Sequence, residues 1–246
     1  MSSASQASAN PLDRLVKALT STISLKIVMM VTGLLGAGFV FFHMLGNLQV
    51  FLGRDAYNDY AEFMQSLGPL LWLARGGLVT ILALHVATSI VLFRRNSSAR
   101  PTPYAGLKQR RTSIAALYMT ELGIVLLLFI IYHILHFTSG VVSVDFNGVN
   151  HFELQQMGEN GLRRDLYTHF IVSFQQPAIA IFYIVASIAL AAHLAHGVTS
   201  AFKTAGLAIG RWRVPFEVLG PAYGIIIGLG NISMPLAVWS GFIGLE

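Results

Sequence analysis

The chain has 246 residues, of which 54% are hydrophobic and 11% are charged. Charged residues usually make up about a quarter of a soluble domain, so this chain has too few to cover a surface that faces water. The basic residues behind its net charge of +5 lie at the ends of apolar runs, which argues against a nucleic-acid-binding patch. The chain has no cysteine, which excludes disulfides and thiolate metal sites. The composition predicts a protein covered mostly by lipid.

The segment that opens the chain, MSSASQASANPLDRLVKALTSTISLK, has no short apolar core followed by a small-residue cleavage site, so we expect no signal peptide. Five later segments reach the length of about 20 mostly apolar residues that a helix needs to cross a membrane. Because lipid offers the backbone no hydrogen-bond partners, these segments are expected to be helices, and none alternates as membrane β-strands do. The sequence therefore predicts an all-α bundle in a single membrane domain, 1–246, with spans at about 24–52, 69–93, 113–140, 168–202 and 215–244.

The connections between these spans differ in charge. The N-terminal arm and the second and fourth connections carry twelve basic residues, whereas the other side carries four, among many acidic residues. The positive-inside rule then places the N-terminus in the cytoplasm and the C-terminus outside. The third connection, about 141–167, resembles a loop with two Asn-Gly turns, and we expect it to cap the outer face.

Six of the eight histidines lie inside the apolar segments, where an ionisable residue is costly and points to function. With the predicted orientation, His43 on the first span and His133 and His136 on the third fall in the outer half. The inner half receives His85 from the second span and His193 and His196 from the fourth. The sequence therefore predicts two layers of histidines, each supplied by two helices.

Two such layers suit two bis-histidine haems stacked across the membrane, because neutral imidazole is a good iron ligand. Zinc would favour ligands that converge on one point, often with Cys, Asp or Glu, and these layers have no nearby carboxylates. An iron held by two imidazoles has no open position for substrate. The predicted role is therefore electron transfer.

Four segments carry a resemblance to a known family: FFHMLGNLQVF, LALHVATSIVLF, LFIIYHILHF and FYIVASIALAAHLAHGVTSAFKTAG. In this order they resemble the single-chain, five-helix, di-haem cytochrome b anchor of succinate dehydrogenase and fumarate reductase. The resemblance covers essentially the whole chain, and HMLGNLQ and the fourth segment are its more specific parts.

The resemblance implies a membrane subunit of a bacterial succinate:quinone oxidoreductase, in the cytoplasmic membrane. Such a subunit binds two haems b and passes electrons between an iron–sulfur subunit and quinone, typically menaquinone. The flavin and the dicarboxylate site belong to soluble flavoprotein and iron–sulfur partners on the cytoplasmic side.

Family spacing also selects among the histidines. It favours His133, which follows an aromatic residue, over His136, and His193, which precedes Gly197 by four residues, over His196. The implied iron ligands are then His43 with His133 and His85 with His193. His136 and His196 remain candidates for binding propionates or lining a quinone pocket.

Four further residues are candidates around the cofactors. Glu62 lies before the second span, where family members use a carboxylate near the outer haem, and a carboxylate can relay the proton of quinone chemistry. A solvated loop acid is the alternative, and Asp55 and Asp59 compete for the role. The remaining three are basic residues at cytoplasmic helix ends that could pair with haem propionates or anchor the helices: Lys26, Arg95 and Lys203.

Two other classes of protein remain open. The cytochrome b subunit of a hydrogenase or formate dehydrogenase also uses intramembrane bis-histidine haems, but usually with ligands on fewer helices. A transporter with a histidine proton relay would be expected to show internal repeats or broken helices, and the sequence has no evident example of either.

Overall fold

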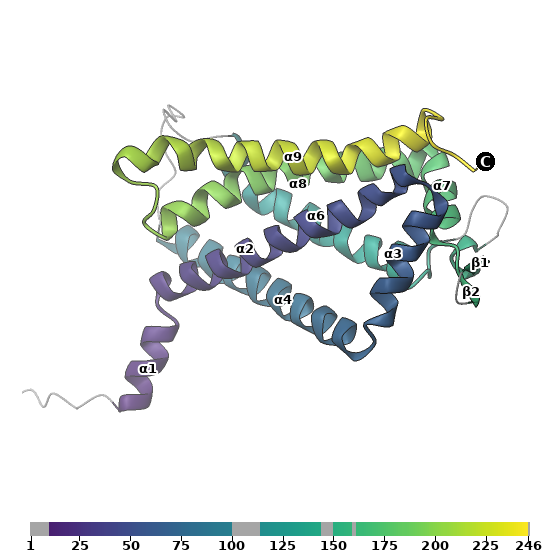
Figure 1. Cartoon of the computed structure of the whole chain (residues 1–246). Helices are drawn as coiled ribbons and strands as arrows, with labels where there is room; N and C mark the ends of the chain where they lie inside the picture. Colours follow the sequence, from purple (N-terminus) through teal and green to yellow (C-terminus); the bar gives the residue numbers. More distant parts are fainter. Residues whose placement is uncertain (1–9, 100–113, 144–149, 159–160, 246) are drawn as a thin grey trace, which may run out of the picture.

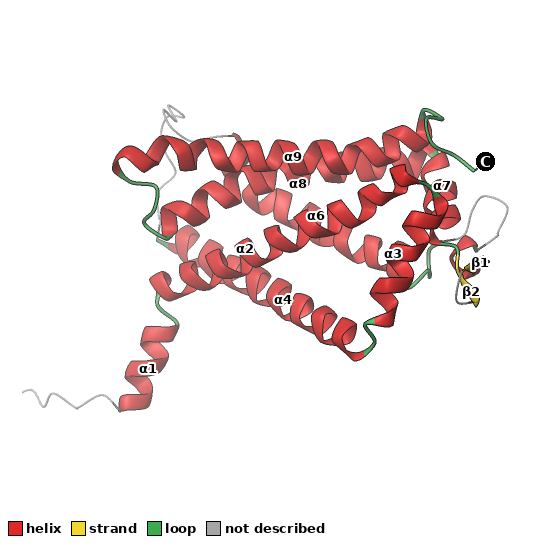
Figure 2. Ribbon diagram, in the orientation of Figure 1, coloured by secondary structure: helices red, strands yellow, loops and turns green. Residues whose placement is uncertain are grey.

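The computed structural model describes residues 10–99, 114–143, 150–158 and 161–245, and within them it is almost entirely helical (Figures 1 and 2). Five helices in this described part of the chain are long and apolar enough to cross a membrane. Their large apolar side chains, such as Leu128, Ile188 and Leu229, are exposed on the outside of the bundle, as expected of a surface covered by lipid. The spans are α2 (Thr22–Asn47) with the turn η1 (Leu48–Leu52), α4 (Pro69–Ser98), α6 (Met119–His133) with the π-helical turn η2 (Ile134–Thr138), α8 (Pro177–Thr204) and α9 (Arg213–Trp239).

The two ends of the bundle differ. The basic end is where α2 and α9 begin and α4 and α8 end, and the helix α1 (Pro11–Leu19) extends from it (Figure 1). The hairpin end carries α3 (Arg54–Ser66), the turn η3 (His151–Glu153), the antiparallel strands β1 (Gln155–Gly158) and β2 (Gly161–Arg164), and α7 (Leu166–Gln175). Two shorter elements complete the fold: α5 (Ile114–Leu117) and η4 (Gly210–Trp212).

The predicted starts of two spans need correction. The fourth span begins at Pro177 rather than near residue 168, because proline lacks an amide donor and disfavours helical backbone at the residue before it, here Gln176. The preceding residues form α7, most of which is buried at the hairpin end instead of facing lipid. The third span likewise begins at Met119, after a break at Tyr118 that separates it from α5.

The connections also contain more structure than the sequence indicated. The first contains the helix α3, and the third, predicted as a loop, contains η3 and the hairpin. The Asn147–Gly148 turn and most basic residues of the second connection lie outside the described residues.

Small residues hold α8 and α9 together along most of their length. Gly220, Gly224 and Gly228 of α9 recur every four residues and face α8. A Cβ at Gly224 would meet the backbone carbonyl of Ala191, so the two backbones touch there. Glycine at such spacing lets membrane helices approach closely. α9 thereby supports α8, which carries His193.

Candidate functional site

The histidine pair predicted for the outer layer, called the outer pair below, lies toward the hairpin end. His43 comes from α2 and His133 from α6, and their ring centres are 5.7 Å apart with the ring planes at 86°. Matched depth predicted His43 with either His133 or His136, and family spacing favoured His133. Two helices that are distant in sequence therefore deliver one imidazole each to the same point.

The pair predicted for the inner layer, called the inner pair below, lies nearer the basic end. His85 comes from α4 and His193 from α8, and their ring centres are 6.4 Å apart with the planes at 69°. Thr32 of α2 contacts His85, and it lies eleven residues before His43, which corresponds to about 16 Å along a helix. The two pairs are thus separated by about half the thickness of the hydrocarbon core.

The spacing within each pair fits one metal ion between two imidazoles. Imidazole nitrogens lie about 2.0 Å from a first-row metal such as zinc, which puts the centres of two opposed rings about 6 Å apart. Both observed separations are close to this value. Within the described residues no three His, Cys, Asp or Glu side chains converge as they would in a conventional zinc site.

A directional chain of hydrogen bonds fixes the tautomer of His133. Ser173 donates its hydroxyl hydrogen to the carbonyl of His169 at 2.7 Å, so it accepts from Nε2–H of His136 at 3.1 Å. Nδ1 of His136 then carries a lone pair and accepts from the hydroxyl of Tyr183 at 3.0 Å. The Tyr183 oxygen in turn accepts from Nδ1–H of His133 at 3.4 Å. The lone pair of His133 therefore lies on Nε2, the nitrogen free to bind a metal.

The same logic applies to the inner pair. Thr32 donates its hydroxyl hydrogen to the Val28 carbonyl at 2.7 Å, so it accepts from Nδ1–H of His85 at 3.2 Å, and the lone pair of His85 lies on Nε2. Nδ1 of His193 is buried without a hydrogen-bond partner among the described residues. An unpaired buried nitrogen is costly unless another group binds it. Glycine at position 33 leaves space for His85, whose Cε1 would lie 3.2 Å from an added Cβ.

His43 fits a metal less simply. Its Nε2 lies 3.3 Å from the amide nitrogen of Asn47, whose carbonyl oxygen accepts from Tyr57 of α3. Asn47 also donates to the His43 carbonyl at 2.8 Å, so the amide has a second, shorter bond. Metal binding through Nε2 would replace the longer of these two contacts. Three of the four histidines therefore offer an available nitrogen, and the fourth needs one weak bond to break.

The two remaining histidines of the long apolar helices lie outside these pairs. His136 is 1% exposed, and both of its ring nitrogens are hydrogen-bonded, to Tyr183 and Ser173. It therefore supports His133 and has no nitrogen left for a metal or a propionate. His196 is half-buried, and within the described residues it makes no ring contact with His85.

Glu62 lies on α3 at the hairpin end, not in a loop. It shares one face of the helix with Asp55 and Asp59, and all three carboxylates approach Arg163 of β2, that of Glu62 at 3.6 Å. The side chain of Glu62 is 35% exposed, against 85% for Asp55 and 62% for Asp59. It also lines a polar cavity of about 240 Å³ with Gln65. Glu62 is therefore the most shielded of the three competing acids.

A buried network holds the hairpin end together. Asp165 caps α7 through the backbone and side chain of Thr168, and it accepts a bond of 2.9 Å from Asn58 of α3. Burial alone would raise the pKa of Asp165, but these bonds and the charge of Arg54 outweigh burial and lower its pKa. Burial likewise opposes the charge of Arg163, yet Asp59 and its neighbours keep the Arg163 pKa raised.

The three basic candidates differ in their contacts. Arg95 donates to the carbonyl of Thr20 at 2.7 Å, between α1 and α2. Lys203 pairs with Glu217 of α9 at 3.3 Å, on the side of α8 that faces α9. Lys26 is exposed on α2. Arg95 and Lys203 therefore have other partners, and a role toward propionates stays a prediction for all three.

The residues that orient the histidines were not predicted from the sequence. These are common hydroxyl and amide side chains with no distinctive spacing, namely Thr32, Asn47, Ser173 and Tyr183. The Asn47–His43 contact could have been predicted, because residues four apart on a helix share a face.

Comparisons with protein-family models, with curated proteins and with solved structures found no match to this chain.

Proposed function

We propose that this chain is a membrane cytochrome b that binds two haems between four helices. The observation that carries the proposal is the pairing of His43 with His133 and of His85 with His193. Each ring comes from a different helix, and the spacing in both pairs fits a metal between two imidazoles. Haem, when bound, supplies reversible one-electron chemistry.

Within this class, we propose the anchor subunit of a succinate:quinone oxidoreductase. The resemblance of the four histidine segments supports it, as does one ligand on each of the first four spans. A flavoprotein and an iron–sulfur subunit would then dock at the basic end, which the positive-inside rule assigns to the cytoplasm of a bacterial cell. Electrons would pass from the inner pair to the outer pair, and on to menaquinone.

In this proposal the chain's own residues have separate tasks. Thr32 and Tyr183 hold His85 and His133 with Nε2 available for iron. Glu62, shielded at the edge of the polar cavity, exchanges the proton that quinone chemistry requires. The apolar bundle around the pairs keeps water away from them.

The test is the haem content of the purified protein. We expect a low-spin spectrum and two haems b per chain by pyridine haemochrome assay. His85→Ala and His193→Ala should remove one spectral component, and His43→Ala and His133→Ala the other. His196→Gln is the matched control and should keep both haems. No haem at all would refute the class, and loss of the same component in the His43 and His85 variants would refute the pairing.

The subunit assignment needs a separate measurement. Affinity purification of the tagged chain from its native membrane should recover a protein with covalently bound flavin and an iron–sulfur protein. Recovery of a hydrogenase or formate dehydrogenase instead would leave the cytochrome class intact and refute the succinate assignment.

A further inference from the structure

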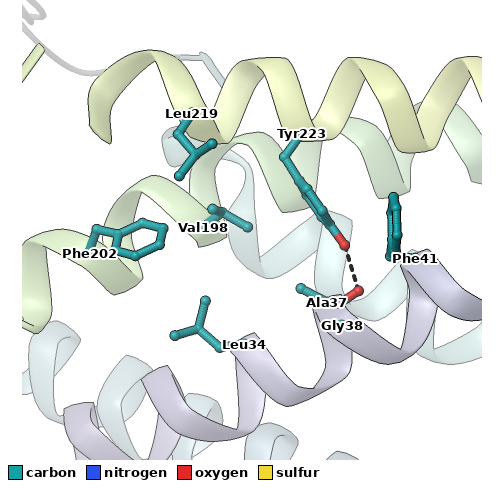
Figure 3. Close-up of a pocket in the computed structure, with 8 residues that line it drawn as sticks. All are labelled: Leu34, Ala37, Gly38, Phe41, Val198, Phe202, Leu219 and Tyr223. Carbon is teal, nitrogen blue, oxygen red and sulfur yellow. Dashed lines mark hydrogen bonds between the residues drawn. The ribbon is translucent and has the colours of Figure 1, made fainter. Parts of the chain in front are cut away.

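An apolar cavity of about 320 Å³ lies between α2, α8 and α9 (Figure 3). None of the paired histidines lines it. Its walls come from all three helices and include Gly38 of α2, Phe202 of α8 and Leu219 of α9.

The cavity is closed toward the hairpin end. There, Met44 of α2 packs against Gly230 of α9 so closely that no Cβ would fit on the glycine. Nearer the basic end, the hydroxyl of Tyr223 donates to the carbonyl of Ala37 at 2.6 Å, the bond drawn in Figure 3. Beyond this bond α2 stands away from α8 and α9, and the cavity occupies the space between them.

Three basic side chains, one on each of these helices, lie between the cavity and the basic end of the bundle. Lys26 lies eleven residues before Ala37, about three full turns, and therefore on the same side of α2. Lys203 follows Phe202 on α8, and Arg213 lies about 9 Å before Leu219 along α9. Lys203 and Arg213 both bind Glu217, at 3.3 and 3.2 Å. These three cations and Glu217, together called the rim below, carry a net charge of +2.

We propose that the cavity binds one acyl chain of an anionic phospholipid, with its phosphate at the rim of Lys26, Lys203 and Arg213. An unfilled space of this size beside the hydrocarbon core would forfeit the contacts that its apolar walls could make. Lipid chains are as apolar as leucine, so the cavity itself hardly distinguishes one lipid from another. The selectivity for an anionic headgroup comes from the charged rim.

A quinone fits the cavity less well. A quinone carbonyl needs a hydrogen-bond donor, and the hydroxyl hydrogen of Tyr223 is already given to Ala37. The other lining side chains are apolar. The contents are therefore a hydrocarbon chain rather than a polar ring.

Native mass spectrometry of the purified complex tests the proposal, with added phosphatidylglycerol or phosphatidylcholine that carry the same acyl chains. We expect one retained phosphatidylglycerol, bound about fivefold more tightly than phosphatidylcholine for each basic residue that contacts it. Arg213→Gln should weaken phosphatidylglycerol about fivefold and leave phosphatidylcholine unchanged. Arg75→Gln, at the other end of the bundle, is the matched control and should change neither.

A second set of variants tests the cavity. A Cβ at Gly38 would meet open space, so Gly38→Leu should fill the cavity without disturbing the fold and reduce retention of both lipids at least about tenfold. Val198→Phe fills it from the opposite wall and should act alike. Gly77→Leu, also in open space but on α4, should have no effect. Equal retention of the two lipids, unchanged retention in the filled variants, or a retained quinone would each overturn the proposal.

Discussion

The hydroxyl of Tyr183 is the most informative single group to remove. It joins two histidines, since it donates to Nδ1 of His136 and accepts from Nδ1–H of His133. Tyr183→Phe keeps the ring, which packs among Phe129, Phe137 and Phe174, and deletes both bonds. We expect a loss of about 2–4 kcal/mol in the free energy of unfolding, because two buried polar nitrogens lose a partner at about 1–3 kcal/mol each, partly offset by relaxation.

The same change should act on the proposed outer haem alone. Donation from Nδ1–H makes imidazole a more basic ligand, which favours the oxidised metal. The bond of 3.4 Å is long, so we take its differential effect as about 0.5 kcal/mol. For a one-electron couple this corresponds to about 20 mV, and the midpoint potential of the outer haem should rise by that amount. Loss of this supporting contact should also weaken retention of the outer haem about tenfold.

Redox titration followed by optical spectroscopy measures both haems in one experiment. The inner haem, held by His85 and His193, serves as an internal reference and should keep its potential. Tyr132→Phe is the matched control, because Tyr132 lies beside Tyr183 and His136 but has no place in the hydrogen-bond chain. An unchanged outer potential in Tyr183→Phe, or equal shifts of both haems, would refute the assigned tautomer of His133.

Three further predictions concern other parts of the chain. Glu62→Gln should lower quinone-linked turnover about 100-fold while both haems and succinate oxidation with a soluble dye persist, and normal quinone turnover would exclude Glu62 as the proton carrier. Asp165→Ala should lower the free energy of unfolding by about 2 kcal/mol at pH 7 through loss of the α7 cap and of the Asn58 bond. Because folding lowers the Asp165 pKa, its stabilising contribution is complete above the unfolded-state pKa of about 3.9 and is lost as pH falls through the folded-state pKa. The stability difference between Asp165→Ala and the unchanged protein should therefore be smaller at pH 3 than at pH 7, and an equal difference would contradict the assignment. Gly224→Leu should cost about 3 kcal/mol by separating α8 from α9, whereas Gly77→Leu, in open space, should cost little in the same thermal unfolding assay.

The number of long apolar helices could be predicted from the sequence because span length and composition are local properties. The sequence predicts five spans, and the described residues contain five helices of suitable length and composition. The errors concern segments whose apolar residues pack on protein instead of lipid. Phe170 and Phe174 extended the predicted fourth span backwards, although both are buried in α7 at the hairpin end. Hydropathy does not distinguish these two environments.

The proximity of the histidine pairs could also be anticipated, because depth in a membrane is a single coordinate. A charge count orients the helices, and the position of each histidine along its span then fixes its level. His43 and His133 contact each other, as do His85 and His193. That these pairs bind haem stays a prediction. Lateral packing is different, since it depends on which faces of helices meet. The small-residue seam of Gly220 and Gly224 was for that reason missed.

Family spacing and hydrogen bonding bear independently on the proposed choice of His133 over His136 as a ligand. Spacing favours His133 because an aromatic residue precedes it. The hydrogen bonds favour it because Ser173 donates its hydroxyl hydrogen to a backbone carbonyl. Ser173 must then accept from His136, and His136 must accept from Tyr183, so the direction of each bond is fixed. No sequence pattern carries this direction, since it arises where one helical turn of α7 meets the π-helical turn η2. His136 therefore supports His133, and its own lone pair is occupied by the Tyr183 hydroxyl. His133 keeps Nε2 free.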